Sequence, residues 1–553
     1  MTDRKHPRLA LGLDSSTQSL SAIVIDIDTA EKCFEHSLDY RAHGRLNQFG
    51  IGADYILPPR EEGEAEQPPL MYLASLDAMF TDMREAGVAL DNIIVINTSG
   101  QQHGHVYLNS EADALLAQLD SRGEVTSSVR NKDGHDLQTL LKGAFSYPTA
   151  PIWMTANTSA QTNHVRETVG GTAEMINLSG SDAPLRFTGT VVRRVAEQHP
   201  ESYAATAKIQ LISSFIPAVL TGNANVPIDY GNACGMSLMN YRSKVWDPAL
   251  LTATAQGLPG DVEEFQSKLP TLVRPDSVVG NLAAYYVEKY GFEGRCAVIA
   301  GSGDNPQAKV PVAGDLLSLG TSFVNMVSTD GDTLDPDGFA NAMYDGINRP
   351  FMFGCRTNGA MVWDAVRNNY GLAKEEYAPA EAALREVVPG QFMTFWQPKT
   401  ESFPVSGAFD LIRTAGQPTL SEDYTGIIET SLAAVYVYSA VFTKQTQAPL
   451  FVTGGATDSP EIMRRVAGIW NRPTLPVEKG GAALGAAVAG VKALHDAANE
   501  SFDIEAFSAS VLKRGEPIQP HPEDVEAYHG EGKYLERFRE KYEQIIAAQP
   551  VLV

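Results

Sequence analysis

The segment LALGLDSSTQSLSAIVIDID occupies residues 9–28 and contains two apolar stretches separated by the polar turn Ser15 to Ser19. Apolar stretches on either side of a short polar turn are typical of a β-hairpin. The pattern predicts strands from Leu9 to Asp14 and from Leu20 to Asp28. Backbone N–H groups in such a turn can converge on phosphate oxygens without a lysine, so the turn is a candidate phosphate site.

A second hairpin of the same design lies at residues 316–327, where Gly320, Thr321 and Ser322 join two apolar strands. The first turn alone could be an ordinary hairpin connection, and the repeat favours a phosphate site. Two copies of one hairpin also predict two related domains. Elsewhere, apolar strands alternate with segments of helical spacing, which predicts α/β layers around largely buried sheets. The expected strands are 93–97, 210–213, 296–300 and 450–453, and the expected helices are 70–85, 190–197, 281–290, 360–369, 426–443 and 460–470.

The length of 553 residues is too great for a single hydrophobic core, so at least two domains are expected. We expect their boundary near Gly291, which gives domains 1–290 and 291–553. The charge-rich segment 498–549 predicts a helical cap on the second domain. The segment 50–69, rich in Pro, Gly and Glu, predicts a surface excursion.

A hydrophobic share of 43% and a charged share of 20% are typical of a soluble globular protein. The net charge of −24 disfavours nucleic acid, whose phosphates the surface would repel. The 4 cysteines form no CxxC pair, which favours reduced structural thiols. The charged N-terminus is unlike a signal peptide, and the longest uncharged helical stretch, 430–443, is shorter than the roughly 20 residues that a bilayer requires. We therefore expect a cytoplasmic protein with no nucleic-acid or membrane partner.

The segment GSGDNP, residues 301–306, follows an apolar run and places Asp304 at the end of a predicted strand. Glycines at a strand end allow another molecule to approach the backbone, because no Cβ excludes it. An aspartate there can take a proton from a substrate hydroxyl; the alternative is a turn-capping aspartate. The chain has no GxxxxGK[ST] loop and no HRD or DFG signature, so a nucleotide would be held by the serine, threonine and glycine turns. These features indicate a small-molecule kinase in which Asp14 holds Mg²⁺ through water.

Seven short motifs occur in an order that resembles the FGGY family of carbohydrate kinases. They are LGLDSSTQ (11–18), SGQQHG (99–104), RFTG (186–189), PIDYGNACGM (227–236), GDNP (303–306), SLGTS (318–322) and TGGAT (453–457). Each motif is weak alone, and the ordered set is strong. The resemblance implies an α/β fold of two ribonuclease-H-like domains, the actin-like ATPase arrangement, with an interdomain catalytic cleft.

The resemblance also implies a reaction and a role for each matched residue. ATP with Mg²⁺ would phosphorylate the terminal hydroxyl of a ketopentose, D-xylulose first, with Asp304 as general base. The first domain would bind the sugar and the second the nucleotide. The implied sugar-binding residues are Gln102, His103, Arg186, Asp304 and Asn305; the implied nucleotide-binding residues are Ser16, Thr17, Gln18, Gly320, Thr321, Gly454, Gly455 and Ser459; Asp14 is the implied metal ligand. The segment GGAALGAA, 480–487, resembles a wall of the adenosine site; tight packing of a helix against a sheet is an alternative interpretation, and the two do not exclude each other.

Four positions depart from the family pattern. Thr155 and Asn232 stand where aspartate is usual, so another ketose or polyol, such as ribulose or an L-sugar, stays open as the substrate. Phe323 stands where glycine or aspartate is typical, and Ser459 where asparagine is frequent; both changes would alter nucleotide affinity. A sugar- or nucleotide-binding protein without catalysis is a further alternative, and a homodimer is compatible with each of these functions.

Overall fold

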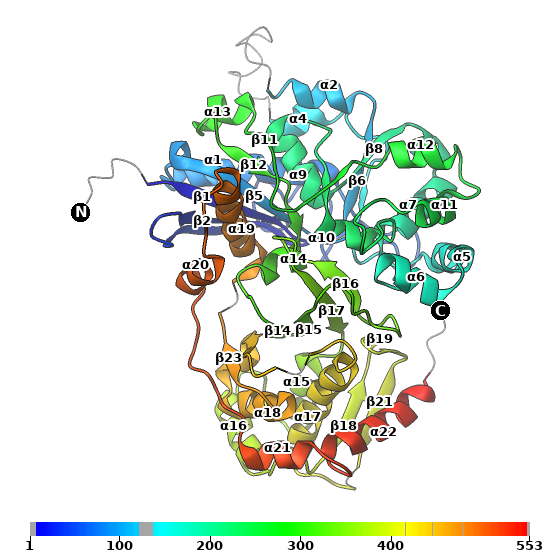
Figure 1. Ribbon diagram of the computed structural model, residues 1–553, viewed down its shortest axis with the longest axis vertical. Helices are drawn as coiled ribbons and strands as arrows, with labels where there is room; N and C mark the ends of the chain where they lie inside the picture. Colours follow the sequence, from blue (N-terminus) through cyan, green and yellow to red (C-terminus); the bar gives the residue numbers. More distant parts are fainter. Residues whose placement is uncertain (1–6, 121–135, 415, 445, 479, 550–553) are drawn as a thin grey trace. The chain divides into compact units, whose positions relative to one another are not determined.

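The computed structural model describes residues 7–120, 136–414, 416–444, 446–478 and 480–549. The chain forms two compact units, whose elements are labelled in Figure 1. Unit 1 comprises the described residues up to Pro311 with Met343–Arg349 and Gly480–Val511, and unit 2 comprises those of Val312–Ala342, Pro350–Lys479 and Leu512–Val553. The boundary expected near Gly291 differs from this grouping, because the elements between that residue and Pro311 belong to unit 1.

Unit 1 is built around a seven-stranded sheet in the order β11-β12-β5-β1-β2-β3, with β13 paired to β5. β1 and β2 form an antiparallel hairpin, which confirms the prediction from residues 9–28. β3 pairs antiparallel with β2, and β5 pairs parallel with β1. The strands are β1 (Leu9–Ser15), β2 (Ser19–Asp26), β3 (Lys32–Asp39), β5 (Ile93–Gly100), β11 (Val278–Asn281), β12 (Ala297–Ile299) and β13 (Ser302–Gly303).

Unit 2 is built around a six-stranded sheet in the order β16-β17-β15-β14-β22-β23. β14 and β15 are antiparallel, β17 follows β15, and β22 pairs parallel with β14. The order β5-β1-β2-β3 of unit 1 therefore recurs as β22-β14-β15-β17, which confirms the predicted repeat. The strands are β14 (Leu316–Leu319), β15 (Phe323–Ser328), β16 (Asn341–Tyr344), β17 (Pro350–Arg356), β22 (Leu450–Thr453) and β23 (Thr474–Pro476).

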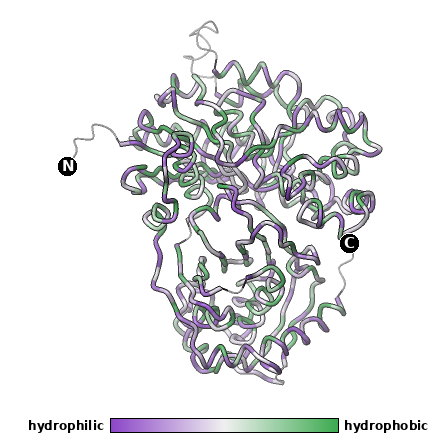
Figure 2. The backbone as a smooth tube through the Cα atoms, viewed as in Figure 1, coloured by the Kyte–Doolittle hydropathy of each residue, from purple (hydrophilic) through white to green (hydrophobic). Residues whose placement is uncertain are grey.

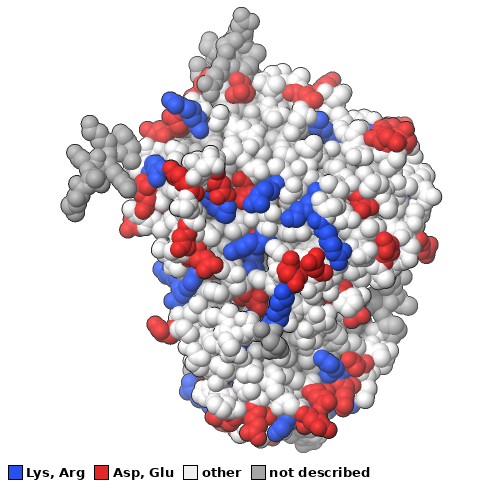
Figure 3. Space-filling model, viewed as in Figure 1, with Lys and Arg blue, Asp and Glu red and all other residues white. Residues whose placement is uncertain are grey.

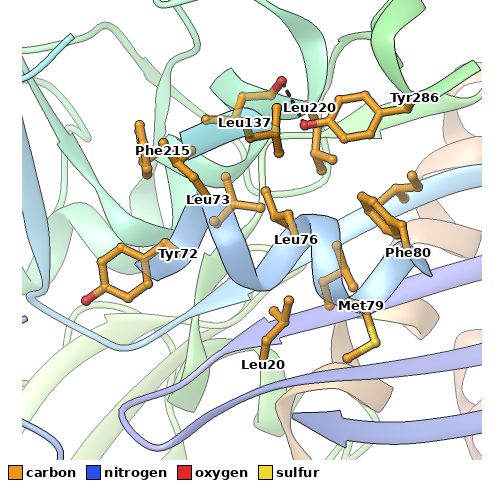
Figure 4. Packing of buried hydrophobic residues seen from close by; sticks show 14 of the residues in the cluster. Leu20, Tyr72, Leu73, Leu76, Met79, Phe80, Leu137, Phe215, Leu220 and Tyr286 are labelled. Atoms are coloured by element: carbon orange, nitrogen blue, oxygen red, sulfur yellow. Dashed lines mark hydrogen bonds between the residues drawn. The ribbon is translucent and has the colours of Figure 1, made fainter. Parts of the chain in front are cut away.

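The core of unit 1 surrounds helix α1. Pro69 is its first residue, where the missing N–H is not needed for an intrahelical bond. Leu20 of β2 lies on one side of this helix and Leu137 of α4 on the other, and Phe80 packs edge-on against Tyr286 of α13 at 5.5 Å between ring centroids (Figure 4). These contacts hold the helical layer against the sheet that carries the first hairpin.

The helices agree with the sequence patterns at most of the expected positions. The described helices of unit 1 are α1 (Pro69–Glu85), α2 (Ala112–Ala117), α4 (Leu137–Leu141), α5 (Ser159–Val169), α6 (Thr172–Ser179), α7 (Thr188–Gln198), α8 (Pro200–Ala204), α9 (Ile212–Thr221), α10 (Tyr230–Ala233), α11 (Pro248–Ala255), α12 (Val262–Ser267), α13 (Ala284–Tyr290), α14 (Asp304–Lys309), α19 (Gly481–Ala497) and α20 (Ile504–Val511). Those of unit 2 are α15 (Ala360–Asn369), α16 (Tyr377–Arg385), α17 (Leu420–Ser439), α18 (Pro460–Trp470), α21 (Pro522–Tyr528) and α22 (Tyr534–Ala547). The segment 498–549, expected to form one helical cap on the second domain, is thus divided between the two units: α20 belongs to unit 1, and α21 and α22 belong to unit 2.

Two local predictions are wrong. The expected strand 210–213 is instead the end of β8 (Thr206–Leu211) and the start of α9, because a short apolar run does not distinguish a strand from a buried helix. The segment 50–69 is not wholly a surface excursion, since Glu64, Glu66 and Gln67 are buried. Their polar side chains find partners such as Arg60, which donates to both glutamates.

The described residues also form short strands outside the two large sheets. They are β4 (Glu66–Gln67), β6 (His105–Asn109), β7 (Ala150–Pro151), β9 (Ile228–Asp229), β10 (Leu272–Val273), β18 (Thr394–Gln397), β19 (Glu401–Ser402), β20 (Val405–Ser406) and β21 (Phe409–Arg413).

Hydrophobic and hydrophilic residues are interspersed along the chain in Figure 2. Within the described ranges no helix has the length and apolar content needed to cross a membrane. Figure 3 shows acidic side chains in several separate groups on the visible face, with lysine and arginine between them.

Helix α19 packs closely on the sheet of unit 1 and on α14. A Cβ built on Gly12 of β1 would lie 1.9 Å from Ala483 O, and one on Gly485 would lie 1.7 Å from Gln307 O. Asn97 Nδ2 of β5 donates a hydrogen bond of 2.9 Å to Ala486 O. The tight-packing interpretation of GGAALGAA is therefore confirmed.

We expect Gly12→Ala to destabilise the protein by about 3 kcal/mol, the upper end of the usual overpacking cost, because its Cβ would meet the backbone of α19. Urea denaturation followed by circular dichroism measures this free energy. Gly44→Ala is the matched control, since a Cβ there meets nothing within 4 Å, and its effect should stay within about 0.5 kcal/mol. Equal denaturation midpoints for the two variants would contradict the packing account.

Candidate active site

Three parallel strand ends meet at one edge of the unit 1 sheet. β5 pairs parallel with β1 on one side and with β13 on the other, so Asp14, Ser99 and Ser302 form a row across the sheet. Because these strands run in the same direction, the segments that follow them leave at the same edge, where open α/β sheets bind ligands. This edge brings together the LGLDSSTQ, SGQQHG and GDNP motifs.

Two carboxylates, those of Asp14 and Asp304, lie at this edge. Ser99 Oγ donates a hydrogen bond of 2.7 Å to Asp14 Oδ1. Burial raises the pKa of Asp14 to about 6, and the bond from Ser99 partly opposes this shift. Burial and, second, the charge of Asp14 raise the pKa of Asp304 to about 7. A carboxyl group with a pKa near neutrality can accept a substrate proton at physiological pH.

Asn305 fixes the carboxylate of Asp304, which is the first residue of α14. The backbone N and the Nδ2 of Asn305 donate to Asp304 Oδ1 at 2.8 and 3.0 Å. Nδ2 also donates to Gln102 Oε1 at 3.1 Å, which joins the GDNP and SGQQHG motifs. Glycine is required at Gly301, where φ is 79° and a Cβ would lie 2.3 Å from Thr98 Oγ1.

His103 is buried and neutral. Burial first, and then the charge of Arg186, lower the pKa of its imidazole to about 3. Its Nδ1 lies 2.9 Å from Gly235 O, and a carbonyl can only accept, so Nδ1 carries the proton and Nε2 is an acceptor. The ring stacks on Phe187 at 4.5 Å between centroids, and the Arg186 guanidinium lies 5.9 Å from the same phenyl ring. All five predicted sugar-binding residues therefore belong to one neighbourhood of unit 1, and their binding role stays a prediction.

The turn at residues 16–18 is held by hydrogen bonds within unit 1. The backbone N and the Oγ of Ser16 both donate to Ser19 O at 3.0 Å. Thr17 Oγ1 accepts from Trp153 Nε1 at 2.8 Å and donates to Gln101 Oε1 at 3.2 Å. The side chain of Gln18 is exposed. The nucleotide-binding role of this turn stays a prediction.

Gln101 and Gln67 support the turn, although the sequence patterns assign neither to the site. Gln101 Nε2 donates to Gln67 Oε1 at 2.7 Å, and Gln67 Nε2 donates to Thr17 O at 2.8 Å. Both side chains are completely buried. The doubled glutamine of GQQHG is a usable signal for Gln101, whereas Gln67 lies in the segment expected at the surface.

Asp229 and Ser302 form a second carboxyl–serine pair that the sequence patterns do not single out. Ser302 Oγ donates to Asp229 Oδ2 at 2.5 Å, and Asn232 N donates to the same oxygen at 3.1 Å. Burial raises the pKa of Asp229 to about 7, against these donors. Ser302 begins β13, directly before the helix that starts at Asp304, and Asp229 is the N-cap of α10.

The two departures expected near the sugar are both buried. Thr155 Oγ1 donates to Ala65 O at 2.9 Å, a bond that an ionised aspartate cannot make. Asn232 Nδ2 donates to Ser213 Oγ at 2.6 Å, and no partner is found for its Oδ1 in the described part of the chain. Each residue thus fits its surroundings as a neutral side chain.

The glycine turns of unit 2 also meet at one sheet edge. β14 and β22 are parallel neighbours, so the turn with Gly320 and Thr321 and the loop with Gly454 and Gly455 follow adjacent strand ends. Gly454 has φ of 105°, and a Cβ there would lie 2.4 Å from Leu319 O. Thr321 and Gly455 are exposed. These backbone groups are available to a nucleotide, and that role stays a prediction.

Ser459 and Phe323 have structural contacts in unit 2. Ser459 Oγ accepts from Ile462 N at 3.2 Å as the N-cap of α18 and donates to Glu381 Oε2 at 2.5 Å. Phe323 is completely buried and packs on Trp363 at 5.0 Å between centroids. Phe323 is therefore a core residue of β15.

Among the residues described, no group of three or more His, Cys, Asp or Glu side chains could hold a metal ion. Mg²⁺ does not require such a group, because in nucleotide sites it is bound by one or two carboxylates with phosphates and waters. The carboxylate of Asp14, at the edge described above, has the donor chemistry that this ion prefers.

The chain belongs to the FGGY family of carbohydrate kinases. Residues 147–310 match the N-terminal domain of that family, and residues 316–494 match its C-terminal domain. Asp14, Gln102 and His103 precede the first matched range, so the sheet register is what joins them to Asp304.

Relatives and solved structures agree with this assignment. A probable D-xylulose kinase A of Aspergillus fumigatus is 30% identical over 412 residues, 72% of this chain and 67% of that protein. One of Aspergillus flavus is 31% identical over 393 residues, 69% of this chain, and the match spans 65% of the length of that relative. The ligand-bound xylulose kinase structure from Lactobacillus acidophilus has a TM-score of 0.76 at 16% identity and covers 98% of each chain. The predicted family and two-domain α/β fold are confirmed.

We expect Ser459→Ala to destabilise unit 2 by about 1 kcal/mol, because α18 loses its N-cap. Urea denaturation measures this loss, and calorimetric titration with ADP measures nucleotide affinity in parallel. Thr446→Ala is an exposed control whose hydroxyl accepts a hydrogen bond from Ala448 N of its own loop. An unchanged stability with a large loss of ADP affinity would instead favour direct contact between the Ser459 hydroxyl and the nucleotide.

Proposed function

We propose that the protein transfers the γ-phosphoryl group of ATP to the terminal hydroxyl of a ketopentose, converting D-xylulose to D-xylulose 5-phosphate. Sugar kinases of this family use ATP as co-substrate, and the curated relatives described above are each named a probable D-xylulose kinase A. The observation that carries the proposal is the carboxylate of Asp304, held by Asn305 beside Gln102 and His103.

Asp304 would act as the general base. The terminal hydroxyl gives its proton to Asp304, its oxygen bonds to the γ-phosphorus, and the bond from that phosphorus to ADP breaks. His103 Nε2 can accept a hydrogen bond from the sugar and Arg186 can donate one. Both Nδ2 hydrogens of Asn305 are already donated, so its side chain would accept through Oδ1. Such complementary groups discriminate between sugars, because a buried polar group left unpaired costs about 1–3 kcal/mol.

The nucleotide would be bound by the turns of both units. The proposed contacts are those of Ser16, Thr17 and Gln18 in unit 1 and of Gly320, Thr321, Gly454, Gly455 and Ser459 in unit 2. Asp14 would hold Mg²⁺ through water, and the ion would neutralise phosphate charge. Such neutralisation matters in a chain with a net charge of −24. On this proposal the N-terminal part binds the sugar and the C-terminal part the nucleotide.

Another ketose or polyol is the second candidate substrate. Thr155 and Asn232, both buried and neutral, stand where the family pattern has aspartate. ADP release measured across a panel of ketopentoses, L-sugars and polyols distinguishes these substrates from D-xylulose. If no sugar stimulates ADP release while the nucleotide still binds, the result would favour a binding protein without catalysis.

We also propose a cytoplasmic location, which fluorescence microscopy of a tagged chain tests. A homodimer is the proposed assembly. Light scattering on the purified protein distinguishes a dimer from a monomer of 59.7 kDa.

We expect Asp304→Asn to lower kcat by about 10²–10⁴-fold, the usual contribution of a general base. The amide keeps the shape of the side chain, so D-xylulose and ATP should still bind in calorimetric titrations. Coupled measurement of ADP release gives kcat. A variant that keeps more than about a tenth of the wild-type kcat would contradict the assigned role.

The activity should fall as pH falls through the pKa of Asp304, which is raised to about 7. The base must be ionised to accept a proton, so kcat/KM for the sugar should rise with pH through about 7 and level off about one pH unit above that value. A bound divalent cation would favour the carboxylate and move this limb to lower pH. The measurement is kcat/KM against pH at saturating ATP; a profile flat down to about pH 5 would indicate an unperturbed carboxyl or no titrating base.

A further inference from the structure

The backbone that delivers Asp304 to the sheet edge is short. β13 consists of Ser302 and Gly303, and α14 begins at the next residue. On one side β13 pairs with β5, opposite Ser99 and Gly100. A two-residue strand offers little ladder pairing, so its position depends on what holds its other side.

The other side of β13 is held by α10 and the residue that precedes it. Asp229 caps α10 by accepting from Asn232 N, and its Oδ2 also accepts the Ser302 Oγ hydrogen bond of 2.5 Å. The carboxylate is 1% exposed and Ser302 is completely buried. A hydrogen bond to a buried carboxylate is among the stronger ones in proteins, because the acceptor is charged or shares its proton.

Two glycines let neighbouring backbone lie close to the pair and to β13. A Cβ on Gly231 would lie 2.8 Å from both Asp229 Oδ2 and Ser302 Oγ, and 2.5 Å from Tyr344 O. A Cβ on Gly303 would lie 3.0 Å from Gln102 Cγ and 3.3 Å from Asn232 Oδ1. The short strand is therefore enclosed between α10 and the SGQQHG segment.

We propose that Asp229 and Ser302 are positioning residues for Asp304, and that their hydrogen bond sets the place of the catalytic carboxylate relative to Gln102 and Asn305. The proposal rests on the proposed function of Asp304. Neither residue is assigned a contact with substrate. Their effect should therefore appear in kcat, and the KM for the sugar should change little.

The test is a graded series in the full chain. Ser302→Ala and Asp229→Ala remove the bond from either side, and each should lower kcat about 10- to 100-fold, the scale of a small misplacement of a reacting group. Asp229→Asn keeps an oxygen acceptor and should recover part of that loss. The KM for the sugar should stay within about twofold throughout.

A double-mutant cycle distinguishes positioning from two independent defects. Because both changes break one bond, the combination of Asp229→Ala with Ser302→Ala should be little worse than either variant alone. Asp247→Asn is the matched control: Asp247 is a buried cap of α11 whose side-chain partners, Asn240, Ala249 and Leu250, are not among the proposed binding residues. It should alter stability without altering kcat.

The outcomes separate this proposal from the function on which it rests. Unchanged kcat in Ser302→Ala, a variant that loses only a hydroxyl, would overturn the positioning role while Asp304→Asn still abolishes turnover. Multiplicative losses in the double variant would overturn it as well. Full activity of Asp304→Asn would overturn the proposed function itself.

Discussion

Parallel pairing of β5 with both of its neighbours is the constraint on which the site depends. It fixes Asp14, Ser99 and Ser302 at one level of the sheet, although Asp14 and Ser99 are 85 residues apart and Ser302 lies much further along the chain. Once that level is set, the turn after β1 and the helix after β13 have a common edge. The charge of Asp14 then adds to the effect of burial in raising the pKa of Asp304.

Local patterns could predict several elements: the two hairpins, the strand β22 that leads into TGGAT, and the small-residue helix α19. Such features depend on residues adjacent in sequence, where turn chemistry and periodicity act directly. The residues that hold the site are different. Gln67 supports the first turn from a segment whose composition indicates a surface loop, and its burial depends on partners contributed by distant strands.

The sequence patterns do not single out Asp229 as a site residue, and the family resemblance places Ser459 at the nucleotide. A buried carboxyl that caps a four-residue helix has no sequence pattern of its own, and only the fold brings Ser302 to it. Ser459 precedes Pro460, an ordinary N-cap signal that competes with any family resemblance. Local rules and family motifs can therefore indicate different roles for one residue: Ser459 makes the N-cap contact, and its nucleotide role stays a prediction.

Unit 1 is completed by a helix from near the end of the chain, since α19 rests on Gly12 of the first strand. During synthesis the sheet of this unit emerges from the ribosome long before its covering helix does. The face of the sheet that α19 covers therefore stays exposed while most of unit 2, residues 312–342 and 350–479, is made. The packing of unit 1 can be completed only after residue 497 has been synthesised, although its first strand is made at the outset.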